Sequence, residues 1–122
     1  MPYIVGPTTP SHLNMSAGIV QSGIKTTEAT GANNLVSLTA ADYQSVDYQI
    51  QVVRGSSYNS GLIKVIHDGT NTYMTEYGNV NQPSVGVVTF STDINSGDLR
   101  LLGYPDSSDS TVFKIIYSAI KA

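Results

Sequence analysis

The sequence contains no cysteine and no tryptophan, and only 12% of its 122 residues are charged. Without cysteine there is no disulfide framework, and thiolate chemistry and cysteine-based zinc sites are excluded. The six basic residues are scattered singly. Because nucleic-acid binding requires clustered positive charge, we expect no nucleic-acid partner. No apolar run is long enough for a membrane span, and the N-terminus lacks the basic leader and apolar run of a signal peptide.

Hydroxyl groups take the place of the missing charge: 27 residues are Ser or Thr, and eight of the ten aromatic residues are Tyr. Helix surfaces normally carry Glu, Lys and Arg, whereas Thr and Tyr favour strands. The composition therefore indicates an all-β protein. The length indicates one domain that is large enough to bury a hydrophobic core.

Short strand-like segments recur along the chain, separated by loops rich in Asn, Asp, Gly, Pro and Ser. The clearest segment is 45–53, where apolar and polar residues alternate. We predict an antiparallel, jelly-roll-like β-sandwich of about eight strands, with a loop at residues 54–61. Two late segments, "LRLL" and "VFKII", are apolar on both sides, which suggests a second buried face. The residues predicted to point inward include Tyr48, Ile50, Val52, Ile63, Val65, Val87, Leu99, Leu101, Phe113 and Ile115.

One stretch, "VIHDGTNTYMTEYG" at residues 65–78, raises the question of a chemical site because it contains His67, Asp68 and Glu76. Adjacent strand residues point to opposite faces, so the histidine and the aspartate diverge. Glu76 lies near the far end of the same segment. The three side chains are therefore not expected to converge, and the stretch is interpreted as a structural hairpin rather than an acid–base or metal cluster.

The turn of this hairpin is predicted from the "DGTN" sequence between two apolar-rich runs. A three-residue loop from Gly69 to Asn71, with Asn71 in the left-handed region, fixes the register. Lys64 then faces Glu76 across the ladder as an opposite-charge pair. The other face, which carries the inward residues Ile63 and Val65, also carries Tyr73 and Tyr77 in this register, and His67 packs against Tyr73.

No catalytic residue, metal site or cofactor is predicted elsewhere. A nucleophilic triad requires a histidine, and the only other one, His12, lies near the N-terminus. Calcium binding through Asp93, Asp98, Asp106 and Asp109 is conceivable because these residues lie in loops. They lack the spacing of a dedicated calcium loop, and turn formation is the simpler interpretation.

Residues 1–17 differ from the rest because three prolines fall within the first ten residues. We interpret 1–17 as an extended N-terminal arm and 18–122 as the sandwich domain. Two alternatives remain open for the arm: a loose terminus, or a segment that lies on a neighbouring subunit. In the second case its apolar anchors are Tyr3, Ile4, Val5, Leu13 and Met15.

Five short motifs stand out along the chain: "Y-x-I-Q-V", "V-x-H-D-G-T", "Y-x-T-E-Y-G", "S-G-x-L-R-L" and "V-x-K". They lie at Tyr48–Val52, Val65–Thr70, Tyr73–Gly78, Ser96–Leu101 and Val112–Lys114. Together they resemble a β module found in virion structural proteins of tailed bacteriophages, notably those of cyanobacteria. The resemblance spans about residues 45–120, rests on turn and core residues and brings no catalytic residues with it.

This resemblance implies a non-enzymatic virion structural protein. A short acidic β protein with an extended arm is most similar to capsid cement or decoration proteins, which bind the outer capsid surface and stabilise contacts between capsomers. The expected partners are the major capsid protein and further copies of the chain, with a trimer favoured. A tail, neck or fibre component, or a carbohydrate-binding adhesin module, is the alternative.

Overall fold

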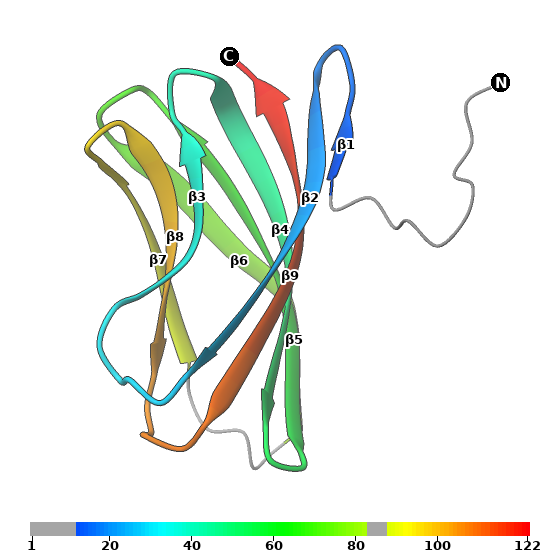
Figure 1. Ribbon diagram of the computed structural model, residues 1–122, viewed down its shortest axis with the longest axis vertical. Helices are drawn as coiled ribbons and strands as arrows, with labels where there is room; N and C mark the ends of the chain where they lie inside the picture. The colour runs from blue at the N-terminus through cyan, green and yellow to red at the C-terminus, as the bar shows by residue number, and fades with distance from the viewer. Residues whose placement is uncertain (1–11, 83–87) are drawn as a thin grey trace, which may run out of the picture.

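The computed structural model describes residues 12–82 and 88–122, which form nine strands and no helix (Figure 1). Within these ranges no helix is long and apolar enough to span a membrane. The strands are β1 (His12–Asn14), β2 (Gly18–Thr27), β3 (Asn33–Thr39), β4 (Tyr43–Arg54), β5 (Ser57–His67), β6 (Thr72–Asn81), β7 (Val88–Asn95), β8 (Asp98–Pro105) and β9 (Thr111–Lys121).

The strands form two antiparallel sheets that face each other as layers (Figure 1). The larger sheet has the order β1-β2-β9-β4-β5-β6 and the smaller has the order β3-β8-β7. Strands from the two ends of the chain pair with each other: β2 pairs with β9, and β3 pairs with β8. These two pairings are jelly-roll-like, whereas β4, β5 and β6 follow one another within the larger sheet, and β7 and β8 within the smaller one. Two facing antiparallel sheets confirm the predicted β-sandwich.

The core lies between the two sheets and follows the alternation that the sequence shows. In β4 and β9 every second residue is buried, as expected for strands with one face toward a core. Nine of the ten residues predicted to point inward are buried, and Val87 lies outside the described residues. The largest fully buried side chains are Tyr48, Phe113, Ile63, Leu99 and Leu101.

Polar contacts join the two sheets along both open sides of the sandwich. On one side the Thr72 hydroxyl of β6 donates to the Thr92 carbonyl of β7 at 3.0 Å, and the Thr92 hydroxyl donates back to it at 2.9 Å. On the other side, Asn33 of β3 accepts from the hydroxyl of Thr27 at the end of β2 and donates to the Gly103 carbonyl. These bonds fix how the layers sit on each other.

The region 54–61, predicted to be a loop, is mostly strand. Only Gly55 and Ser56 form the turn, since Arg54 already pairs with Ser57 and β5 begins there. Gly55 has a φ of 60°, which a tight two-residue hairpin requires and glycine adopts without strain. The Ser- and Asn-rich composition of this segment favoured a loop, but pairing with β4 overrides that local preference.

Candidate functional site

The hairpin between β5 and β6 is present, but its predicted register is wrong by one residue. The loop contains four residues, 68–71, rather than three. Lys64 therefore faces Thr75 instead of Glu76, and Glu76 faces Ile63. The ammonium group of Lys64 lies 3.0 Å from a carboxylate oxygen of Asp47 on β4, so its opposite-charge partner is on the other neighbouring strand.

A shift of one residue moves each side chain of β6 to the other face of the sheet. Tyr73 and Tyr77 were expected on the core side and are instead exposed on the outside. Met74 takes the inner position and packs against the core. The histidine consequently does not pack against Tyr73, because His67 is opposite Thr72.

The loop geometry explains the register. One carboxylate oxygen of Asp68 accepts hydrogen bonds from the backbone N–H groups of Thr70 and Asn71, at 3.0 and 2.7 Å. Its other oxygen accepts from the Tyr73 hydroxyl at 3.1 Å. These hydrogen bonds lower the pKa of the Asp68 carboxyl group, and the bond from the Asn71 N–H has the largest effect. Gly69, not Asn71, takes the positive φ, at 96°.

His67 is 6% exposed and serves as a structural link. Its Nδ1 accepts a hydrogen bond from the backbone N–H of Gly69 at 2.9 Å. Its Nε2 lies 2.6 Å from the carbonyl oxygen of Tyr43, so Nε2 carries the proton and donates. The Gln44 side chain donates to the backbone carbonyl of His67. Both ring nitrogens are therefore engaged in hydrogen bonds to the backbone of the turn and of β4.

Of the four aspartates considered for calcium because they were expected in loops, Asp93 lies within β7 and Asp98 begins β8, so the expectation is wrong for these two. The carboxylate of Asp93 binds the Arg100 guanidinium through two hydrogen bonds of 2.6 and 2.8 Å, which lower the pKa of Asp93. Asp106 lies 3.0 Å from a guanidinium nitrogen of Arg54. Among residues 12–82 and 88–122 no group of three or more His, Cys, Asp or Glu side chains is placed to hold a metal ion.

The N-terminal arm is described only from residue 12. His12–Asn14 form β1, a short strand that pairs with β2 at the edge of the larger sheet. Leu13 and Met15, two of the expected anchors, are exposed. The other three, Tyr3, Ile4 and Val5, lie outside the described residues, so their docking on a neighbour stays a prediction.

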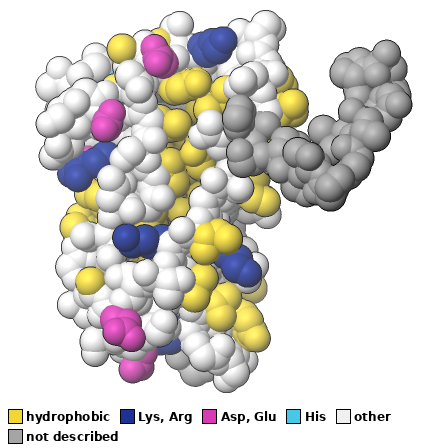
Figure 2. Space-filling model, in the orientation of Figure 1, with side chains coloured by type: hydrophobic (Ala, Val, Ile, Leu, Met, Phe, Trp, Pro, Cys, Tyr) yellow, Lys and Arg dark blue, Asp and Glu magenta, His cyan; other side chains and the backbone are white. Residues whose placement is uncertain are grey.

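The most distinctive surface is the side of the larger sheet that points away from the core, which we call the outer face. Nine of the ten large hydrophobic side chains exposed in the described residues lie on it, as the strand registers show. Figure 2 shows hydrophobic side chains along this side of the molecule as well as in the seam between the sheets. The nine are Leu13, Ile24, Tyr58, Ile66, Tyr73, Tyr77, Val80, Ile116 and Ile120.

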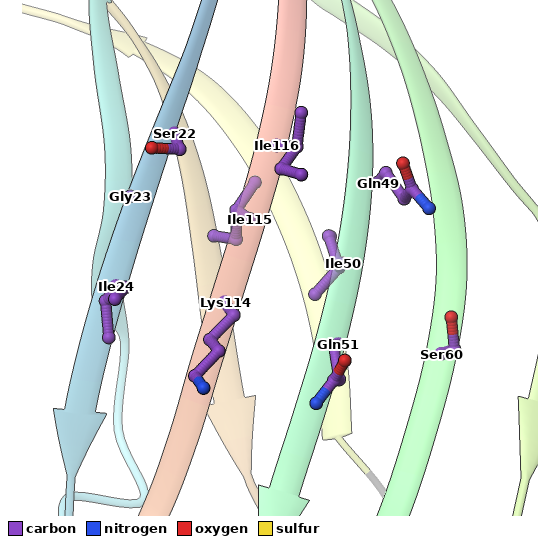
Figure 3. Close-up of a pocket in the computed structure, with 10 residues that line it drawn as sticks. All are labelled: Ser22, Gly23, Ile24, Gln49, Ile50, Gln51, Ser60, Lys114, Ile115 and Ile116. Atoms are coloured by element: carbon purple, nitrogen blue, oxygen red, sulfur yellow. The ribbon is translucent and has the colours of Figure 1, made fainter. Parts of the chain in front are cut away.

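A hollow of about 320 Å³ lies in the middle of the outer face. Ile24, Lys114 and Gln51 lie side by side across β2, β9 and β4, and Ile116 and Gln49 form the next row (Figure 3). A second hollow of about 290 Å³ adjoins it and shares the Gln51 lining. The lining of these two hollows thus combines aliphatic groups with amide side chains and a single lysine, Lys114.

The exposed face of the smaller sheet has a different character. Thr89 and Asn95 are exposed there, and the Asp93–Arg100 ion pair crosses from β7 to β8. None of the large exposed hydrophobic side chains of the described residues lies on this sheet. The two outer surfaces of the sandwich therefore differ: one is polar and the other is apolar.

No protein-family model matches the sequence, and no curated protein matches it. The solved structures that are similar in fold include two phage tailspike proteins. The tailspike protein gp49 of Acinetobacter baumannii bacteriophage Fri1, a capsular polysaccharide depolymerase, has a TM-score of 0.55 at 14% identity, over 93% of this chain and 20% of that one. The tailspike protein of Acinetobacter phage vB_ApiP_P1 has a TM-score of 0.51 at 13% identity, over 99% of this chain and 24% of that one.

These likenesses establish that the fold of this chain also occurs as part of phage tailspike proteins. The chain spans only about a fifth to a quarter of the length of either tailspike.

The sequence analysis did not identify the outer face. Its tyrosines Tyr73 and Tyr77 could be assigned to this face only with the correct register of the β5–β6 hairpin.

Proposed function

We propose that this protein is a non-catalytic structural module of a tailed-bacteriophage virion, belonging to the tail spike or fibre. The observation that carries the proposal is that nearly the whole chain superposes on part of two phage tailspikes. The motif resemblance to phage virion proteins over residues 45–120 supports the same setting independently. A placement on the outer capsid, as a cement protein, gains no specific support from these likenesses.

We propose no depolymerase activity for the chain. The depolymerase gp49 is five times longer than the region that this fold covers. The acid–base candidates of the sequence have structural roles: His67 is held by two hydrogen bonds and Asp68 caps a turn. A sandwich with one polar and one apolar surface is suited to attachment between other parts of an assembly.

Electron microscopy of particles labelled through a tag at Ala122 tests this placement. We expect label at the tail end of intact particles. Label over the capsid would restore the cement interpretation, and purified particles without the protein would exclude a virion role. Incubation of the protein with capsular polysaccharide tests for catalysis, and we expect no new reducing sugar ends to be released.

A further inference from the structure

The outer face is an exposed apolar surface that no other part of the described chain covers. Its central strands contribute Ile24, 72% exposed, and Ile116, 57% exposed. Exposed apolar patches of more than a few hundred Å² are uncommon on monomeric proteins and mark interaction sites. The gathering of nine such side chains on one face, and of none on the other sheet, requires an explanation.

The size of the outer face is that of a stable protein interface. Five of its strands are between 10 and 12 residues long. Strands spaced about 4.8 Å apart and rising about 3.3 Å per residue cover roughly 800 Å². This matches the area of about 800 Å² that each partner contributes to a standard interface.

The charges of the outer face favour a partner with the same surface. Asp47 and Lys64 form an ion pair with each other, which leaves Lys114 as the remaining charged side chain in the strand positions of this face. A strongly acidic partner would therefore meet Lys114 as the single complementary charge outside that ion pair, and a strongly basic partner would meet none. Two nearly neutral apolar sheets pack face to face about 10 Å apart, as the two layers of a sandwich do.

The aliphatic residues of the face argue against a sugar as its main occupant. Sugar rings stack on aromatic rings, whereas the middle of the face, around the larger hollow, presents Ile24 and Ile116 (Figure 3). Branched aliphatic side chains interdigitate well with the same kind of side chain on an opposing sheet. We propose that the outer face is a self-association surface on which a second copy of this chain packs with its own outer face.

Sedimentation equilibrium of the full chain, over a wide concentration range, measures this association directly. Because the contact joins the same face of two copies, we expect a dimer that dissociates on dilution. Ile116→Asp puts an unpaired charge into the contact of each copy, and we expect it to raise the dissociation constant at least about 100-fold. Thr89→Asp, which adds the same charge to the smaller sheet, is the matched control and should change nothing.

A second experiment does not depend on a charge at position 116. Because the chain has no cysteine, Gln49→Cys gives a single thiol in the centre of the outer face. A short bis-maleimide should join two Gln49→Cys chains efficiently and two Thr89→Cys chains poorly. Circular dichroism of each variant verifies that the strands are retained.

The possible outcomes separate the alternatives. A monomer at all concentrations, equal association of Ile116→Asp and the wild type, or equal cross-linking at the two cysteine positions would overturn the proposal. So would a mass that increases without limit, because it would indicate non-specific aggregation. A monomer that binds a glycan array, with binding lost in Ile116→Asp, would make the face a sugar site instead. The proposal does not depend on the virion role, and labelling elsewhere in a particle would leave it intact.

Discussion

Replacing His67 with alanine tests whether the β5–β6 turn is structural, because the substitution removes both contacts of the imidazole. The Gly69 N–H and the Tyr43 carbonyl lose their partners at 2.9 and 2.6 Å. A group left unsatisfied in a buried place costs about 1–3 kcal/mol, and the exposed loop gives the Gly69 N–H partial access to water. We therefore expect His67→Ala to lower the free energy of unfolding by about 2–3 kcal/mol. For a domain of this size, the melting temperature should fall by roughly 10 °C.

Urea denaturation at pH 7, followed by far-UV circular dichroism, measures this loss. Two further variants separate the contacts: His67→Asn keeps an acceptor near the position of Nδ1, and His67→Gln keeps a donor near the position of Nε2. Each should retain about half of the lost stability. If all three variants unfold within about 0.5 kcal/mol of the wild type, these bonds do not hold the turn. If His67→Ala abolishes particle attachment without any loss of stability, the turn is a functional site.

Three further predictions follow from buried polar groups and from one ion pair. The Tyr48 hydroxyl is buried without a hydrogen-bond partner among the described residues, so Tyr48→Phe should leave the free energy of unfolding unchanged or raise it by up to about 1 kcal/mol. In the same urea titration, Tyr117→Phe should lower the free energy of unfolding, because it removes a 2.6 Å hydrogen bond to Gln21. Asn33→Ala removes donors to three backbone carbonyls and should cost about 2–3 kcal/mol, while the exposed Asn34→Ala should cost less than about 0.5 kcal/mol. The pKa of Asp93 is lower in the folded protein than in the unfolded chain. The ionised carboxylate therefore stabilises the fold fully above about pH 4, and this stabilisation is lost as the pH falls through the pKa of the folded state. Between pH 7 and pH 2.5 the melting temperature should decline less steeply in Asp93→Asn than in the wild type.

The sequence predicted those features of the fold that depend on a period of two. Alternation in 45–53 identified a strand with one buried face, and nine of ten predicted core residues are buried. The division into sheets of six and three strands could not be predicted in this way. It depends on pairings between distant segments, such as β2 with β9 and β3 with β8, which no local pattern encodes.

Errors arose where a turn decided the outcome. At the β5–β6 hairpin, a loop of three residues and a loop of four were both compatible with the "DGTN" sequence. The four-residue loop forms because the Asp68 carboxylate binds two backbone N–H groups within it and Gly69 supplies the positive φ. A shift of one residue in register exchanges the two faces of β6. The three-residue loop therefore predicts Tyr73 and Tyr77 on the core side, whereas the four-residue loop of the structure leaves them exposed.

Strand β9 connects the sequence pattern to the proposed self-association. Its inward residues Phe113 and Ile115 are buried by the smaller sheet, while Ile116 and Ile120 on the same strand point to the outer face and are exposed. Strands that are apolar on both sides normally have a layer on each side. Within the described residues the chain provides one such layer, on the inner side only. The exposed isoleucines on the outer side of β9 therefore agree with the proposed self-association, in which a second copy of the chain would supply the missing layer.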